Sequence, residues 1–174
     1  MSKVNQPAGR HFLQIPGPSN VPDSVLRAMA DSVMDHRGPD FPAMTHEILF
    51  QLKPIFNTQD PIVIFPSSGT GAWEAALVNT LSPGDKILAF ETGWFATLWK
   101  QMAEKLGLEV EWVPGDWRSG VDPQVVEEKL RDDTKKKIKA ICVVHNETST
   151  GTTSRLEEIR QAIDETEHPA LFMV

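Results

Sequence analysis

The strongest constraint on the fold is an alternation that begins near residue 62, in which short apolar runs are separated by segments with helical spacing. The runs cover residues 62–65, 87–90, 108–113, 138–144 and 170–174. Several of them are apolar at every position, which is typical of strands that are covered on both faces. The alternation therefore predicts an α/β fold, in which a mainly parallel sheet lies between helical layers as a three-layer sandwich.

Helices are expected before and between these runs. They span about residues 25–33, 44–55, 71–81, 95–106, 122–131 and 156–163. Pro54 should end or kink the second helix, and Asp122 followed by Pro123 suits the start of the fifth. Residues 1–20 are rich in Pro, Gly and Asn and predict an extended arm, so that residues 21–174 form the larger domain.

The composition limits which kinds of partner the protein is expected to bind and in which cellular compartment it is expected to lie. The net charge of -7 and the pI of about 5.2 argue against nucleic acid or an anionic membrane as the main partner. The single cysteine, Cys142, lies between Ile141 and Val143, which predicts a buried thiol and a reducing compartment. The 5 histidines show no metal-ligand spacing, and no apolar stretch approaches the roughly 18 residues of a membrane span. We expect a cytoplasmic protein that binds no metal and spans no membrane.

Ligands of parallel α/β folds gather at the carboxyl ends of the strands, so the loops there are candidates for a site. The first, residues 66–74, places small residues between a strand and a helix. Backbone N–H groups at such a helix start, with the hydroxyls of Ser68 and Thr70, can bind an anion. The loop lacks the Lys of a P-loop, and Glu74 replaces the last Gly of the dinucleotide fingerprint, which favours a single phosphate monoester. The same residues can also form a tight turn without a ligand.

Two further loops follow strand ends. Trp94 can stack on a planar ligand or simply pack in the interior. The polar segment at residues 145–151 can form a turn with a helix cap, or it can aim its hydrogen bonds at a polar cofactor. Together the loops offer an anion site, an aromatic plane and a hydroxyl cluster. Pyridoxal 5′-phosphate (PLP) has a phosphate, a planar ring and a ring hydroxyl, which match these features.

Several segments of the chain, taken together, resemble one family. They are Pro16–Asn20, Asp35–Arg37, Ser67–Glu74, Ser82–Asp85 and Val144–Gly151, in this order. Over about residues 8–174 the chain resembles the class V PLP-dependent aminotransferases of fold type I, and within them the serine–glyoxylate and alanine–glyoxylate aminotransferases. The resemblance implies transfer of an amino group from serine or alanine to glyoxylate, which gives glycine. It also implies a homodimer and a PLP-binding large domain of which residues 21–174 are the N-terminal part.

The resemblance implies a cofactor site with a turn that binds the phosphate, an aromatic residue that stacks on the pyridine ring, and a hydroxyl that contacts the ring. These parts are, in that order, Ser68 with Gly69 and Thr70, then Trp94, then Thr148. The arm that lines the substrate carboxylate site is implied to include Pro16, Gly17 and Pro18. Asp35–Arg37 lies near the active-site face in this family, without an assigned catalytic step.

The apolar run at residues 170–174 reads as a strand in which the chain stops, so we expect the N-terminal fragment of a longer protein. In the family, the Asp that pairs with the pyridine nitrogen, the Schiff-base Lys and the Arg that binds the substrate carboxylate come later. These residues are expected beyond Val174, so no catalytic residue is assigned, and the chain alone is expected to be inactive. Two alternatives stay open: a cysteine-desulfurase-like or other fold type I enzyme, and a non-catalytic phosphate-binding α/β module.

Overall fold

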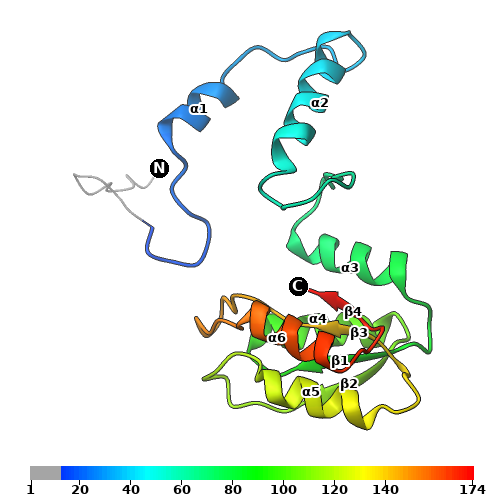
Figure 1. Cartoon of the computed structure of the whole chain (residues 1–174). Helices are drawn as coiled ribbons and strands as arrows, with labels where there is room; N and C mark the ends of the chain where they lie inside the picture. Colours follow the sequence, from blue (N-terminus) through cyan, green and yellow to red (C-terminus); the bar gives the residue numbers. More distant parts are fainter. Residues whose placement is uncertain (1–12) are drawn as a thin grey trace. The chain divides into compact units, whose positions relative to one another are not determined.

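The computed structural model describes residues 13–174, and residues 1–12, which hold much of the expected arm, lie outside the described part. The chain divides into two units, Met1–Ile64 and Phe65–Val174. Figure 1 draws the first unit in blue and cyan and the second from green to red. The expected boundary between arm and larger domain at residue 20 stays a prediction. Within residues 13–174, no helix combines the length and the apolar character needed to cross a membrane.

The first unit contains two helices, α1 (Asp23–Met29) and α2 (Asp40–Leu52). The first helix ends at Met29 and not near residue 33 as predicted, so Val33 lies outside it and is exposed. The second ends just before Pro54, as predicted. Neither helix buries a residue, so the described part of this unit has no helical core of its own.

The second unit is built on a four-stranded sheet with the strand order β2-β1-β3-β4. The strands are β1 (Lys86–Phe90), β2 (Glu109–Val113), β3 (Ile138–Cys142) and β4 (Leu171–Met173). Every neighbouring pair is parallel, which confirms the predicted sheet. The central strands β1 and β3 are mostly buried, whereas the edge strands β2 and β4 are partly exposed.

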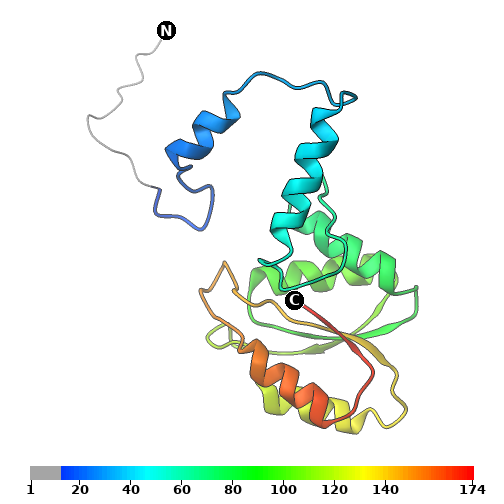
Figure 2. The same ribbon diagram turned by 45° about the horizontal axis from the view of Figure 1, so that its top comes forward.

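Helices cover both faces of this sheet. The helices α3 (Gly69–Thr80) and α4 (Trp94–Lys105) lie on one face, and α5 (Pro123–Asp132) and α6 (Leu156–Glu165) lie on the other. Figure 2 shows the two green helices on one side of the strands and the yellow and orange helices on the opposite side. The predicted three-layer α/β sandwich is therefore confirmed.

Side chains of β1 alternate between two hydrophobic cores. Leu88 and Phe90 belong to the core under α5 and α6, whereas Ile87 and Ala89 belong to the core under α3 and α4. Because successive side chains point to opposite faces, a strand between two cores must be apolar at every position. Cys142 lies in the α3–α4 core, as predicted, and burial raises the pKa of its thiol to about 12.

One predicted strand is wrong. Residues 62–65 form no strand, and the side chains of Val63, Ile64 and Phe65 are 67%, 62% and 52% exposed. A strand is stable only when its backbone N–H and C=O groups pair with a neighbour. Within the described residues, the strands of the sheet pair only with one another, so this segment has the composition of a strand but no partner.

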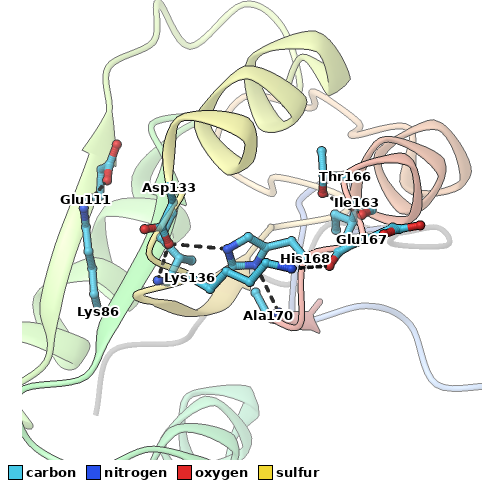
Figure 3. A network of polar contacts seen from close by, with 10 residues as sticks. Lys86, Glu111, Asp133, Lys136, Ile163, Thr166, Glu167, His168 and Ala170 are labelled. Carbon is cyan, nitrogen blue, oxygen red and sulfur yellow. Dashed lines mark hydrogen bonds and ion pairs between the residues drawn. The ribbon is translucent and has the colours of Figure 1, made fainter.

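A polar network fastens the amino ends of β3 and β4, as Figure 3 shows. Asp133 accepts a hydrogen bond of 2.6 Å from the backbone N–H of Ile138, and its Oδ2 lies 3.4 Å from Nε2 of His168. Nδ1 of His168 accepts a hydrogen bond of 3.2 Å from the backbone N–H of Ala170. The network joins the loop before β3 to the loop before β4. It lies at the amino ends of the strands, opposite to their carboxyl ends.

Candidate functional site

The first candidate loop leads directly into α3, which begins at Gly69 rather than at Gly71 as predicted. Ser68 occupies the N-cap position, but its side chain makes no capping hydrogen bond, and the first turn holds no acidic residue. Ser68, Gly69 and Thr70 are exposed, and a Cβ added at Gly69 would meet no atom within 4 Å. The helix start therefore carries backbone N–H groups without a side-chain cap and has free space beside them, which suits an anion.

The second loop leads into α4. Side chains from the third loop cap this helix by accepting hydrogen bonds from its first backbone N–H groups. The carboxylate of Glu147 accepts hydrogen bonds from the backbone N–H groups of Phe95 at 3.2 Å and Ala96 at 3.1 Å. The hydroxyl of Ser149 accepts one of 2.8 Å from the N–H of Trp94. Oε1 of Glu147 in turn accepts the N–H of Ser149 at 3.1 Å and its hydroxyl at 2.7 Å. These contacts join two loops that lie 51 residues apart in sequence.

Aromatic packing joins the start of α3 to the start of α4. The indole of Trp73 stacks on that of Trp99 with ring centroids 5.3 Å apart, and it meets Phe95 edge-on at 6.2 Å. Trp99 is buried and Trp73 is partly buried, so the two indoles form a packed contact between α3 and α4. Since Trp73 lies early in α3 and Phe95 early in α4, the two helix starts lie on the same side of the unit. The start of α4 thus contacts Trp73 of α3 on one side and the third loop on the other.

The side chains expected to contact a ring lie exposed at this junction. Trp94 is the first residue of α4, and its side chain is 49% exposed. Thr148 is also exposed, and both of its neighbours along the chain, Glu147 and Ser149, bond to the first turn of α4. The backbones that carry Trp94 and Thr148 are thus held next to each other. No interaction that we observe joins either of them to Gly69, so a shared ligand stays a prediction.

No lysine of the second unit lies at the carboxyl ends of the strands. Lys86 begins β1 and pairs with Glu111 at 2.5 Å, and Lys100 pairs with Glu104 at 2.7 Å on α4. The lysines at 135–137 lie in the loop before β3. Across residues 13–174 there is also no group of three or more His, Cys, Asp or Glu residues that could hold a metal. The second unit therefore places exposed hydroxyl, backbone N–H and aromatic groups at its helix starts, and none of its lysines lies there.

Sequence reasoning left open whether the third loop caps a helix or contacts a cofactor, and it did not identify the residue that caps. The structure shows that Glu147 and Ser149 cap α4, whereas Thr148 between them stays exposed. The sequence feature that marks this cap is Gly93, because an added Cβ there would lie 2.6 Å from Cδ of Glu147 and 2.7 Å from Oγ of Ser149. To use that signal, one must already know that β1 and β3 are neighbours.

The expected substrate-binding residues Pro16, Gly17 and Pro18 lie in the first unit, where all three are exposed. Asp35–Arg37 belongs to the same unit and forms a turn, in which the N–H of Arg37 donates to Oδ1 of Asp35 at 2.9 Å. The role of Pro16, Gly17 and Pro18 at a substrate site stays a prediction.

Comparisons with known proteins agree with the resemblance seen in the sequence. Residues 11–174 match the family model described as aminotransferase class-V. Serine–glyoxylate aminotransferase from Methylorubrum extorquens is 48% identical over 175 residues, which cover 100% of this chain and 43% of that protein. Serine–glyoxylate aminotransferase from Arabidopsis thaliana is 47% identical over 167 residues, which cover 95% of this chain and 42% of that protein.

The fold matches as well. The crystal structure of ureidoglycine–glyoxylate aminotransferase from Bacillus subtilis superimposes with a TM-score of 0.83 at 27% identity, over 97% of this chain and 42% of that one. The chain thus spans less than half the length of the relatives it matches. The matches argue against the alternative of an unrelated phosphate-binding α/β module. By sequence and by fold, the chain belongs to the class-V aminotransferase family.

Proposed function

We propose that the full-length protein is a PLP-dependent aminotransferase that transfers the amino group of serine or alanine to glyoxylate and so forms glycine. The class-V family is PLP-dependent, and relatives at 48% and 47% identity are serine–glyoxylate aminotransferases. The observation that carries the proposal is a contrast between two helix starts. The start of α4 is filled by Glu147, whereas the start of α3 has no side-chain cap and lies open beside the same junction.

The residues present fit a flat, phosphorylated group. In the proposed site, the N–H groups at the start of α3 bind the phosphate together with the hydroxyls of Ser68 and Thr70, and Gly69 leaves room for it. Trp94 covers one face of the ring and excludes water from it, while Thr148 hydrogen-bonds to a polar substituent of the ring. PLP, when bound, supplies an electron-withdrawing ring that stabilises negative charge on the Cα atom of the amino acid.

In the proposed site, the residues of the second unit orient the cofactor, and none of that unit's lysines is a covalent partner, because they lie elsewhere on its helices, strands and loops. By the resemblance, the Schiff-base Lys belongs to the part of the relatives' length that this chain does not span, so we expect the 174-residue chain to be inactive alone. We further propose that Pro16, Gly17 and Pro18 line the substrate carboxylate site, that the intact enzyme is a cytoplasmic homodimer, and that its large domain includes residues 21–174.

The test uses the purified full-length protein with glyoxylate and either serine or alanine, with and without added PLP. We expect glycine to form together with hydroxypyruvate from serine or pyruvate from alanine, and we expect formation to require PLP. Chromatographic measurement of glycine and of the keto acid checks both products. The proposal is wrong if neither donor yields glycine, and its part on the isolated chain is wrong if residues 1–174 alone turn over.

A further inference from the structure

Glu147 is a buried carboxylate to which the proposed cofactor site gives no direct contact. The residue is only 1% exposed. Thr148, one of the two proposed ring contacts, follows it along the chain. Trp94, the other, directly precedes Phe95 and Ala96, the residues whose N–H groups Glu147 binds. One carboxylate therefore bonds the backbone next to one ring contact to the backbone next to the other.

We propose that Glu147 is a positioning residue, whose carboxylate fixes the spacing between Trp94 and Thr148 and thereby the slot that accepts the pyridine ring. The inference rests on the proposed PLP site. It assigns to Glu147 no contact with the cofactor and no chemical step. Its effect is to keep two side chains from different loops at a constant separation.

The geometry calls for a carboxylate rather than for any polar group. Oε1 of Glu147 accepts hydrogen bonds from the N–H of Phe95 and from the N–H and hydroxyl of Ser149, and Oε2 accepts one from the N–H of Ala96. Only an ionised carboxylate is an acceptor on both oxygens, and its charge suits a helix N-terminus. Burial would raise the pKa of Glu147, but the hydrogen bonds from Ser149, Ala96 and Phe95 outweigh it and hold that pKa below its ordinary value.

The substitution Glu147→Gln keeps the shape but replaces one acceptor oxygen with an NH2 group. That group would face N–H donors, so at least one hydrogen bond at the start of α4 or to Ser149 is lost. The first turn of α4 and the third loop then separate or rotate against each other. The start of α3 contacts α4 through the ring of Trp73 but shares no hydrogen bond with Glu147, so its N–H groups, and with them the phosphate subsite, should be unaffected.

The matched control is Glu91→Gln, which makes the same chemical change directly after β1. The carboxylate of Glu91 accepts a hydrogen bond of 3.1 Å from Nε1 of Trp117 and one of 3.4 Å from the N–H of Gly115. Both partners belong to the loop after β2, which carries none of the proposed cofactor contacts. The change therefore tests whether loss of any strand-end carboxylate weakens the site.

The experiment measures, in the full-length protein freed of cofactor, the affinities of wild type and both variants for PLP and for inorganic phosphate by titration calorimetry. Circular dichroism verifies that each variant is folded. We expect Glu147→Gln to bind PLP about tenfold more weakly, the equivalent of one lost buried hydrogen bond, and to bind phosphate like wild type. We expect Glu91→Gln to resemble wild type with both ligands.

A merely structural role would loosen the whole region and weaken both ligands in parallel, so the ratio of the two affinities is decisive. An unchanged PLP affinity, or equal losses for PLP and phosphate, overturns the inference. If wild type binds neither ligand, the proposed function itself fails. Should Glu147→Gln not fold, Ser149→Ala gives the same test, because it removes the hydroxyl that bonds to Trp94 and to Glu147. The expected loss is then about threefold for PLP alone.

Discussion

Gly69 and Gly93 both stand at the start of a helix, yet the space around them differs. A Cβ at Gly69 would meet no atom within 4 Å, whereas a Cβ at Gly93 would lie 2.6 Å from Cδ of Glu147 and 2.7 Å from Oγ of Ser149. Real Cβ atoms do not approach other atoms so closely, so Glu147 would have to move and lose hydrogen bonds to α4. Packing requires glycine at position 93, whereas only the proposed ligand requires it at position 69.

The two glycines therefore predict opposite results. Gly93→Ala should lower the free energy of unfolding by about 1–3 kcal/mol, the usual cost of overpacking. Gly69→Ala should leave it within about 0.5 kcal/mol of wild type or raise it slightly, because alanine suits a helix and meets no atom there. Gly69→Ala should nevertheless weaken PLP binding, since its methyl group occupies the phosphate space. Urea unfolding and PLP titration of both variants check this, and equal stabilities would contradict it.

At the scale of single residues, the sequence predicted which side chain is buried better than it predicted which residues form hydrogen bonds with each other. Cys142 was expected to be buried from its apolar neighbours, and the structure confirms it. The capping role of Glu147 was not identified, because its partners lie 51 and 52 residues away. Local sequence shows that a strand-end loop is polar, but not which helix start it will meet.

At the scale of elements, α3 offers a test that separates helix stability from ligand binding. Thr70 lies in the first turn of α3 and is exposed, and that turn holds no acidic residue. Thr70→Glu should raise the free energy of unfolding by about 0.3–1 kcal/mol, because a negative charge interacts favourably with a helix N-terminus. The same charge should repel the phosphate of PLP and weaken its binding at least about tenfold.

The matched control for this prediction is Thr70→Gln, whose new side chain has nearly the same size as glutamate but carries no charge. It should change stability little and weaken PLP binding less than the glutamate does. Chemical denaturation and PLP titration of both variants, in the full-length protein, measure the two effects. A PLP affinity that Thr70→Glu leaves unchanged would show that the start of α3 is not the phosphate site.

Helices and strands were predictable where their own residues determine them. They were less predictable where a neighbouring strand is needed. The helices α4, α5 and α6 show clear apolar spacing, and Asp122 caps α5 as predicted, by accepting a hydrogen bond of 2.9 Å from the N–H of Gln124. The run at residues 62–65 is as apolar as β1 but forms no strand, because no neighbour pairs with it in the described sheet. A strand depends on residues far away in sequence, so composition alone overestimated the number of strands.

At the scale of the whole molecule, two carboxylates bridge elements at opposite ends of the sheet, and Glu147 is buried whereas Asp133 is partly buried. Glu147 acts at the carboxyl ends of the strands, and Asp133 at the amino ends, where it accepts the N–H of Ile138. Burial would raise the pKa of Asp133, but the backbone N–H groups of Ile138 and Lys137 and the nearby imidazole of His168 outweigh it and lower that pKa. A carboxyl group whose pKa is lowered by folding stabilises the fold above its unfolded pKa, near 4, and loses that contribution as pH falls through the folded value.

Both carboxylates should therefore contribute to acid unfolding, and they should do so independently. Along β3 alone, the four steps from Ile138 to Cys142 at a rise of about 3.3 Å per residue separate the two ends by roughly 13 Å, beyond the range at which mutations usually couple. Asp133→Asn and Glu147→Gln should each lower stability at pH 7, and each should reduce the further loss of stability between about pH 5 and pH 2. The double variant should show the sum of both effects, to be measured by urea unfolding across this pH range. A loss in the double variant much larger or smaller than that sum would mean that the two ends of the sheet are coupled, and wild-type acid sensitivity in Asp133→Asn would mean that the group titrates alike in both states.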